Sequence, residues 1–303
     1  MPGAPIPVTE MMNTREVAQY LRVKERKVYD LVRKRRIPCT RVTGKWLFPK
    51  PLIDLWMTRN TEAPGLGPGP LAPPPRVAVG SHDPLLEWAL RESRSGLAHL
   101  GGGSLDGLKR LAEGQAALCG LHVFDAETGG YNQPVVAKAC AGLDVVLLEW
   151  AWREQGLVLA PGNPLGIGRL ADLAKKKARL VGRQHEAGSQ ILLLHLLAEA
   201  GIALADLSFL ERPALSETDL GSAVLEGKAD AGLAVAAVAR QLRLDFLPLH
   251  RERYDLLLAR REYFEEPVQK LMAFAASEAF RDRAREMTGY DVSGLGRVVY
   301  NAP

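Results

Sequence analysis

MNTREVAQYLRVKERKVYDLVRKRRIPCTRVTGKWLFPKPLIDLWM, residues 12–57, contains the strongest structural signals of the chain. Asn13 is followed three residues later by Glu16, and this pairing is the capping-box pattern that begins a helix. A second helix is expected to begin near residues 24–25, because apolar residues then recur at helical spacing. These residues are Val28, Leu31 and Val32. Two short helices with so tight a connection predict a helix-turn-helix.

The rest of this stretch predicts a hairpin and a third helix. Ile37-Pro38 ends the second helix, because proline has no backbone N–H and clashes with the preceding turn. The β-prone runs 40–42 and 46–48 flank Thr43-Gly44-Lys45, which is the pattern of a β-hairpin. An apolar helix follows over residues 52–57. Helix, turn, helix, hairpin and helix is the order of a winged helix.

Charge is distributed unevenly along the 303 residues. The net charge is +4, yet residues 10–60 hold 13 basic and 5 acidic residues, a local charge of +8. The rest of the chain holds 26 basic and 30 acidic residues. A compact basic module beside a mildly acidic body indicates a polyanion-binding head.

A linker is predicted over Asn60–Pro75, which reads NTEAPGLGPGPLAPPP. Nine of its sixteen residues are proline or glycine, so it has too few apolar side chains to build a core. We therefore expect a DNA-binding domain over 10–59, the linker over 60–75 and a larger domain over 76–303.

The head resembles the excisionase-type, MerR-related helix-turn-helix family. The resemblance rests on the Thr14-x-x-x-Ala18-x-x-Leu21 opening, Val28-Tyr29, the Ile37-Pro38 stop, the Gly44-Lys45-Trp46 wing and Trp56. It covers about 45 residues and implies binding of double-stranded DNA, usually as a dimer.

The cations of the head suit such a role. Lys24, Arg26 and Lys27 open the second helix outside its apolar stripe and are expected to reach base edges in the major groove. Further cations at the helix end and on the wing suit phosphates. These are Arg33, Lys34, Arg35, Arg36, Arg41 and Lys45. The alternative for each is a solvated surface charge. Tyr29 is expected to pack beside Val28 under the wing, and the alternative is contact with a DNA phosphate.

Beyond residue 76, short β-prone runs alternate with helical ones, which predicts an α/β domain with a largely parallel sheet and crossover helices. Separate strands are expected at 145–148 and 156–160, and again at 246–249 and 256–258. One long helix is expected over 267–287.

This body resembles the two-lobed, type II periplasmic-binding-protein-like sensor domains related to molybdate-binding proteins. The resemblance spans about residues 76–295 and rests on several short segments. These include Val79-Gly80-Ser81-His82-Asp83, Gly101-Gly102-Gly103-Ser104, Asp125–Asn132, Arg153–Leu157, Ala160–Pro164, Gly188-Ser189 and Gly227–Gly232. It implies one lobe of about 76–150 and 250–303, a second of about 151–249, and a ligand between them.

Serines follow strands and open helices at three places: Ser81, Ser104 and Ser189. Free N–H groups at a helix start, with a hydroxyl beside them, bind oxyanions, and Gly188 would allow close backbone approach. Arg183 would add positive charge. A serine at a helix start is also the commonest N-cap, and that alternative stands for each one.

Other candidates for the ligand site are His82, Tyr131, Asn132 and Tyr254. His82 and His122 are also candidates for a shared metal site, although lone histidines are more often structural. The sequence has no HExxH, GxSxG or phosphate-cradling GxxxxGK[ST] motif, so we expect neither an enzyme nor a bound cofactor.

The sequence therefore predicts a one-component transcriptional regulator, a homodimer or higher oligomer, whose effector is an oxyanion such as molybdate or tungstate. Three isolated cysteines, no apolar run of roughly 20 residues and no amino-terminal signal pattern indicate the cytoplasm without membrane contact. The alternatives are a small-molecule-binding or metabolic protein with an accessory DNA-binding head, and a phage-type architectural DNA-binding factor.

Overall fold

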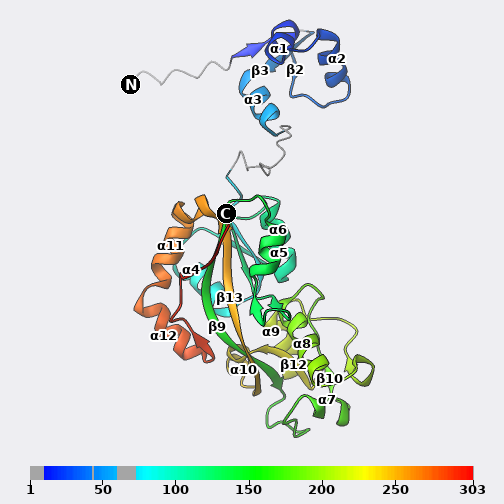
Figure 1. The fold of residues 1–303 in the computed structure, drawn as a ribbon, viewed down its shortest axis with the longest axis vertical. Coiled ribbons are helices and arrows are strands. Elements are labelled where there is room, and N and C mark those ends of the chain that lie inside the picture. The colour runs from blue at the N-terminus through cyan, green and yellow to red at the C-terminus, as the bar shows by residue number, and fades with distance from the viewer. Residues whose placement is uncertain (1–9, 43, 60–72, 303) are drawn as a thin grey trace. The chain divides into compact units, whose positions relative to one another are not determined.

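The computed structural model describes residues 10–42, 44–59 and 73–302. The chain divides into two compact units at Pro73/Pro74, drawn as ribbons in Figure 1. Most of the predicted linker, residues 60–72, and Thr43 of the predicted wing lie outside the described residues.

The amino-terminal unit has the predicted winged-helix order. Asn13 caps the first helix through its side chain, and Glu16 completes the capping box by accepting from the Asn13 N–H. The strands form one antiparallel sheet in the order β1-β3-β2. A small core of Val17, Val28, Phe48 and Ile53 holds helices and sheet together. The elements are β1 (Met11–Met12), α1 (Thr14–Tyr20), α2 (Glu25–Arg33), β2 (Thr40–Val42), β3 (Lys45–Pro49) and α3 (Lys50–Arg59).

The carboxy-terminal unit is built on one ten-stranded sheet that passes through two lobes. Its main path runs β11-β10-β12-β9-β13-β6-β4-β5, parallel within each lobe and antiparallel at the two central strands. The sheet is thus mixed and not largely parallel. Lobe 1 begins with β4 (Val77–Ser81), α4 (Pro84–Glu92), β5 (Ala98–Gly102), α5 (Ser104–Ala112), β6 (Leu118–Leu121), β7 (Phe124–Asp125), β8 (Gly130–Tyr131) and α6 (Gln133–Ala139).

Two long strands connect the lobes: β9 (Val145–Leu159) and β13 (Asp245–Ala259). They run side by side along the unit in Figure 1. The prediction of separate short strands in these regions was wrong, because polar residues such as Arg153 interrupt the apolar pattern without ending the strand. Lobe 2 contains α7 (Ala171–Lys175), β10 (Arg179–Leu180), α8 (Gly188–Glu199), η1 (Leu204–Asp206), β11 (Ser208–Phe209), α9 (Glu217–Leu225), β12 (Ala231–Val235) and α10 (Ala236–Leu242).

The chain returns through β13 to complete lobe 1. The predicted single helix over 267–287 is two helices, because Ser277 caps a new helix by accepting from the Phe280 N–H. Helices cover both faces of the lobe 1 sheet, α4 and α11 on one and α5 and α6 on the other. The closing elements are η2 (Arg260–Phe264), α11 (Glu266–Ala275), α12 (Glu278–Met287), β14 (Tyr290–Asp291) and β15 (Val298–Asn301).

Candidate functional site

The start of α2 presents a cationic surface. Val28 is fully buried against the head core, whereas Lys24, Arg26 and Lys27 are exposed. None of these three side chains has an ion-pair partner among the described residues. Cations at a helix amino terminus oppose the helix dipole, so an external anion at this end would be favourable.

The remaining predicted cations lie at the end of α2 and on the hairpin. Asp30 pairs with Arg33 at 2.8 Å and with Lys34 at 3.0 Å. Hydrogen bonds from Lys34 and then Arg33 lower the pKa of Asp30. The Arg41 guanidinium lies 5.3 Å from the centre of the Trp46 ring. Arg35, Arg36 and Lys45 are also exposed and have no ion-pair partner among the described residues.

Tyr29 departs from its predicted place. Its side chain is 52% exposed, so the prediction that it packs under the wing was wrong. The inward face of α2 is occupied by Val28 with Leu31 and Val32, and the next residue along a helix points about 100° away from such a face. Tyr29 therefore belongs to the solvent-facing surface that carries the cations.

In the carboxy-terminal unit, Ser81 and Ser104 lie next to each other on the side of lobe 1 that meets lobe 2. Ser81 ends β4 and Ser104 is the first residue of α5; their Oγ atoms lie 2.9 Å apart. The His122 N–H donates to Ser104 Oγ at 3.2 Å, and the Tyr254 hydroxyl donates to the Ser81 carbonyl at 2.5 Å. All four residues are buried. Tyr254 was predicted to lie at the ligand site, and its hydroxyl contacts the backbone carbonyl of Ser81 there.

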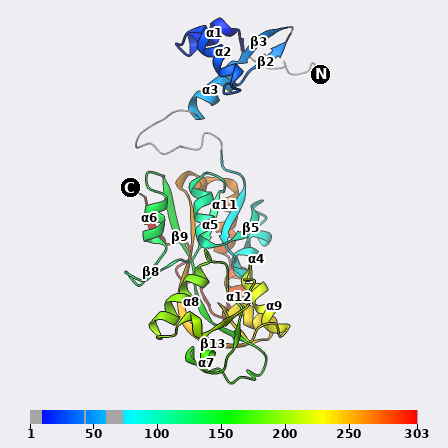
Figure 2. The same cartoon turned by 90° about the vertical axis from the view of Figure 1, so that its right-hand side faces the viewer.

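The amino termini of α5 and α8 approach each other across the two lobes, and Figure 2 shows these helices one above the other. The Leu105 N–H donates to the Glu186 carbonyl at 3.3 Å. A Cβ added at Gly103 would lie 2.6 Å from that carbonyl oxygen, and one added at Gly188 would lie 2.5 Å from the His122 oxygen. Two glycines therefore allow the lobes to close at this point.

Ser189 lies next to Gly188 in the first turn of α8. It is buried, and its Oγ has no hydrogen-bond partner among the described residues. A buried hydroxyl without a partner costs free energy. Arg183 is also buried in lobe 2, where its Nε donates to the Ala214 carbonyl at 3.1 Å and its Nη2 to the Leu215 carbonyl at 3.1 Å. Burial lowers the pKa of Arg183.

Tyr131 and Asn132 lie elsewhere in lobe 1. Asn132 is fully buried and donates to Asp255 at 2.7 Å, while its other contacts are backbone groups of the adjoining loop. Tyr131 packs edge-on against Phe124 and Trp152. The structure therefore uses Asn132 to hold β13 and the loop together and does not bring it to the serine pair.

A buried ion network crosses the middle of β9 and β13, and sequence reasoning missed it. Arg153 Nη1 lies 2.8 Å from Asp83 Oδ2, and its Nη2 pairs with Glu252. His122 Nδ1 lies 2.8 Å from Glu252 Oε2. Burial by itself would raise the pKa of Glu252, but Arg153 and His122 outweigh this and hold it at about 2. The available signal was the group of polar residues Glu149 and Arg153–Gln155 between two apolar runs of the same strand.

The network also reaches lobe 2. Gln155 Nε2 donates to Glu252 Oε1 at 2.9 Å and lies 3.2 Å from Glu217 Oε1, at the start of α9. The second Glu217 oxygen accepts the Val235 N–H at 2.8 Å. Residues of lobe 1, both crossover strands and lobe 2 are thus linked by one set of hydrogen bonds.

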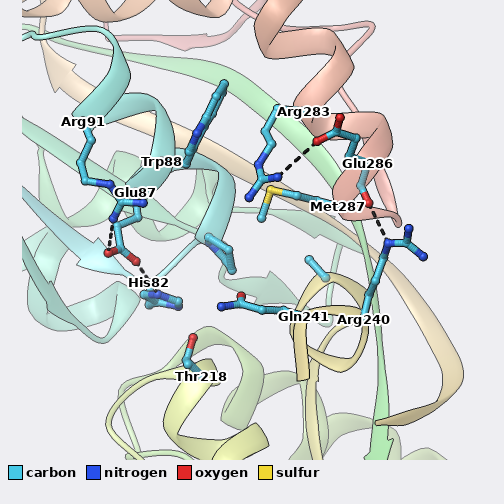
Figure 3. A pocket seen from close by; sticks show the side chains of 12 residues that line it. His82, Glu87, Trp88, Arg91, Thr218, Arg240, Gln241, Arg283, Glu286 and Met287 are labelled. Carbon is cyan, nitrogen blue, oxygen red and sulfur yellow. Dashed lines mark hydrogen bonds and ion pairs between the residues drawn. The ribbon is translucent and has the colours of Figure 1, made fainter. Parts of the chain in front are cut away.

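His82 faces a different part of the space between the lobes. Its Nε2 lies 3.1 Å from Glu87 Oε2, and it lines a cavity of 680 Å³ between α4 and α12 of lobe 1 and α9 and α10 of lobe 2, drawn in Figure 3. His122, in contrast, lies in the ion network, so the two histidines have different partners. In the described part of the chain, no three histidine, cysteine or acidic residues are placed to hold a metal ion.

Comparison with known proteins gives two family matches. Residues 11–61 match a helix-turn-helix domain and residues 87–276, more than half of the chain, match the PBP superfamily domain. The uncharacterized protein YvgK of Bacillus subtilis is 26% identical over 304 residues, covering 96% of this chain and 98% of that protein. An uncharacterized protein from the 5′ region of a 2Fe-2S ferredoxin gene of Clostridium pasteurianum is 28% identical over 110 residues, or 36% of this chain and 97% of that protein.

Solved structures show the same fold in the carboxy-terminal unit. A phosphate ABC transporter substrate-binding protein from Clostridium perfringens, with bound phosphate, has a TM-score of 0.52 at 12% identity, covering 73% of this chain and 98% of that one. The tungstate ABC transporter structure from Geobacter sulfurreducens has a TM-score of 0.51 at 16% identity, covering 69% and 97%. Among the described residues, no helix has the length and apolar character needed to cross a bilayer. The two-lobed architecture and the family match agree, and the chain belongs to the PBP superfamily, with a helix-turn-helix domain on its amino-terminal side.

Proposed function

We propose that the protein is a one-component transcriptional regulator that binds double-stranded DNA through α2 and the wing and binds an oxyanion, molybdate or tungstate, between the lobes. The observation that carries the ligand assignment is the meeting of two helix amino termini at buried serines. Ser104 begins α5, Ser189 lies in the first turn of α8, and Ser189 Oγ has no partner among the described residues.

Neutral donors suit a small dianion that is stripped of water. The first N–H groups of a helix are without intrahelical partners and the helix dipole is positive at this end, so both favour an anion. Serine hydroxyls add donors without a counter-charge. Among proteins of this fold, one structure is that of a tungstate transporter and another carries phosphate, which supports the same ligand class.

Closure of the lobes gives the ligand a way to affect DNA binding. Gly103 and Gly188 allow the two helix ends to meet, so an anion bound by both ends favours the closed over the open arrangement. A ligand can shift an equilibrium only by its difference in affinity for the two states. In a homodimer, closure in each subunit would change the spacing of the paired heads. In this proposal the protein is a cytoplasmic homodimer that has no catalytic activity and needs no cofactor.

The ligand assignment is tested by isothermal titration calorimetry of the full chain with molybdate, tungstate and sulfate. S104A and S189A should weaken molybdate binding by roughly tenfold or more, since hydrogen bonds to charged groups contribute about 1.5–3 kcal/mol. S277A is the matched control, because Ser277 also opens a helix but caps α12 away from the serine pair. The assignment is wrong if none of the three anions produces heat, or if S277A weakens binding as much as S104A.

DNA binding is tested separately by fluorescence anisotropy with a duplex from the promoter region that precedes the gene. The affinity should fall steeply with salt: the logarithm of the association constant should decrease with the logarithm of the salt concentration, with a slope of about −0.9 for each phosphate contacted. R26Q should lower affinity, whereas R110Q, a change of an α5 cation in the other unit, should not. Affinity that is independent of salt, or equal for R26Q and R110Q, would contradict the role of α2.

A further inference from the structure

The 680 Å³ cavity between the lobes is distinct from the serine pair. It lies between α4 and α12 on one side and α9 and α10 on the other. Figure 3 shows four side chains directed toward its centre: His82 from the connection between β4 and α4, Thr218 from α9, Gln241 from α10 and Arg283 from α12. A molecule that fills it would therefore contact both lobes.

Two residues that line this cavity each carry a buried polar atom without a partner in the described part of the chain. His82 Nδ1 and Arg283 Nε are buried and have no hydrogen-bond partner among the described residues. Buried polar groups are normally paired, and each unpaired one costs about 1–3 kcal/mol. Both atoms have almost no accessible surface in this arrangement, so other atoms of His82 and Arg283 line the cavity.

The wall combines positive charge with apolar surface. Arg283 Nη1 lies 3.2 Å from Glu286 Oε2, and its guanidinium lies 5.7 Å from the centre of the Trp88 ring. Trp88 and Met287 supply apolar atoms beside it. Three arginines line the cavity against two glutamates, so its charge favours an anion. The preferred anionic partners of a guanidinium are phosphate and carboxylate.

The size excludes a bare tetrahedral oxyanion as the natural occupant. At about 30 Å³ for each water-sized group, five heavy atoms occupy roughly 150 Å³, which is less than a quarter of the cavity. Pockets for organic ligands usually measure about 300–1,000 Å³ and combine apolar walls with a few polar groups.

We propose that this cavity is a second ligand site that binds an organic anion, a phosphate or carboxylate carried on an aromatic or other apolar body. The Arg283 guanidinium binds the anionic group, Trp88 and Met287 contact the body, and His82 lies beside the ligand in the cavity wall. The site is independent of the serines and holds whether or not they bind an oxyanion.

The test separates the two features of the ligand. Calorimetry on the full chain uses 1-naphthyl phosphate and 1-naphthoate, which combine ring and anion, and 1-naphthol and inorganic phosphate, which each supply one of them. Comparing the affinities of 1-naphthyl phosphate and 1-naphthoate shows whether the site prefers a phosphate or a carboxylate. We expect at least one of these two to bind roughly tenfold or more tightly than 1-naphthol and inorganic phosphate, since a charged hydrogen bond contributes about 1.5–3 kcal/mol.

Variants locate the binding. R283Q should weaken binding of the tighter naphthyl probe roughly tenfold or more. R110Q is the control, because Arg110 also forms an ion pair on a helix surface, and it should leave binding of the probe unchanged. Q241W places a tryptophan in the cavity at a residue that is exposed, so it should abolish binding of the probe without disturbing the core. This variant tests the site even if R283Q does not fold. S104A should leave naphthyl binding unchanged, and R283Q should leave molybdate binding unchanged, so the two sites fail independently. The proposal is overturned if neither combined probe binds, if 1-naphthol binds equally well, or if Q241W binds like the unchanged protein.

Discussion

Asp255 gives a quantitative prediction about stability and pH. Its carboxylate is fully buried in β13, where it accepts from Asn132 Nδ2 at 2.7 Å and from Arg253 Nε at 3.0 Å. Burial raises its pKa from 3.8 to about 6, although Arg253 and Asn132 act in the opposite direction. A raised carboxyl pKa means that folding favours the protonated form. Its contribution to stability is fully present below pH 3.8 and is lost as the pH rises through about 6.

The magnitude follows from the two pKa values. At 1.36 kcal/mol for each pKa unit, the full loss is about 3 kcal/mol, and about half of it has already occurred at pH 5. The other half, roughly 1–2 kcal/mol, is lost between pH 5 and pH 8, which corresponds to a decrease in Tm of roughly 2–8 °C for a unit of this size. This decrease is the part of the pH dependence that D255N should remove.

Differential scanning calorimetry of the full chain measures this effect as the Tm of wild type and of D255N at a series of pH values. Other groups titrate in the same range, so the decisive quantity is the difference between wild type and D255N at each pH. Wild type should lose stability relative to D255N as the pH rises from 5 to 8. Parallel Tm curves for the two proteins, or a wild type that gains stability relative to D255N, would refute the reasoning.

Three further predictions concern other parts of the chain. R26Q should weaken duplex binding by about 1–3 kcal/mol if the side chain reaches a base edge, with an unchanged circular dichroism spectrum because Arg26 is exposed; an unchanged anisotropy titration would exclude this contact. G188A should lower affinity for the interlobe anion, because its Cβ would lie 2.5 Å from the His122 oxygen and oppose closure; calorimetry showing wild-type affinity would exclude that steric role. E252Q should destabilise the unit by roughly 3–5 kcal/mol, because it breaks a buried pair with Arg153; a loss of under about 1 kcal/mol in calorimetric unfolding would contradict the importance of the pair.

The head could be predicted well because its signals are local. The capping box at Asn13, the apolar spacing around Val28 and the hairpin at Gly44 each depend on residues within one turn or one hairpin. Tyr29 was misplaced, since a single aromatic residue beside an apolar position does not state which way it faces. In the body, alternating strands and helices predicted the α/β class, and the resemblance to two-lobed binding domains supplied the lobes. Ser81 and Ser104 were found because each follows a strand and precedes a helix.

The remaining features depend on contacts between distant parts of the chain. Polar residues from Glu149 to Gln155 made β9 look like two strands, because a charged residue normally ends a buried run. The carboxylates that offset the Arg153 charge, Asp83 and Glu252, lie 70 and 99 residues away. Asn132 resembled a ligand residue in a glycine turn, yet its partner Asp255 lies on β13. The 680 Å³ cavity is formed by four helices from two lobes, so no local pattern predicts it.

The ion network and the serine pair are parts of one structure, and this bears on how a ligand would be sensed. Asp83 caps α4 through one oxygen and binds Arg153 of β9 through the other. The carbonyl of Ser81, two residues earlier, is held by Tyr254 of β13, and the Arg153 guanidinium lies 4.4 Å from the centre of that tyrosine ring. Both crossover strands therefore set the position of Ser81. Because any movement of one lobe on the other must bend these strands, an anion that fixes Ser81 in one place also restricts the strands to one conformation.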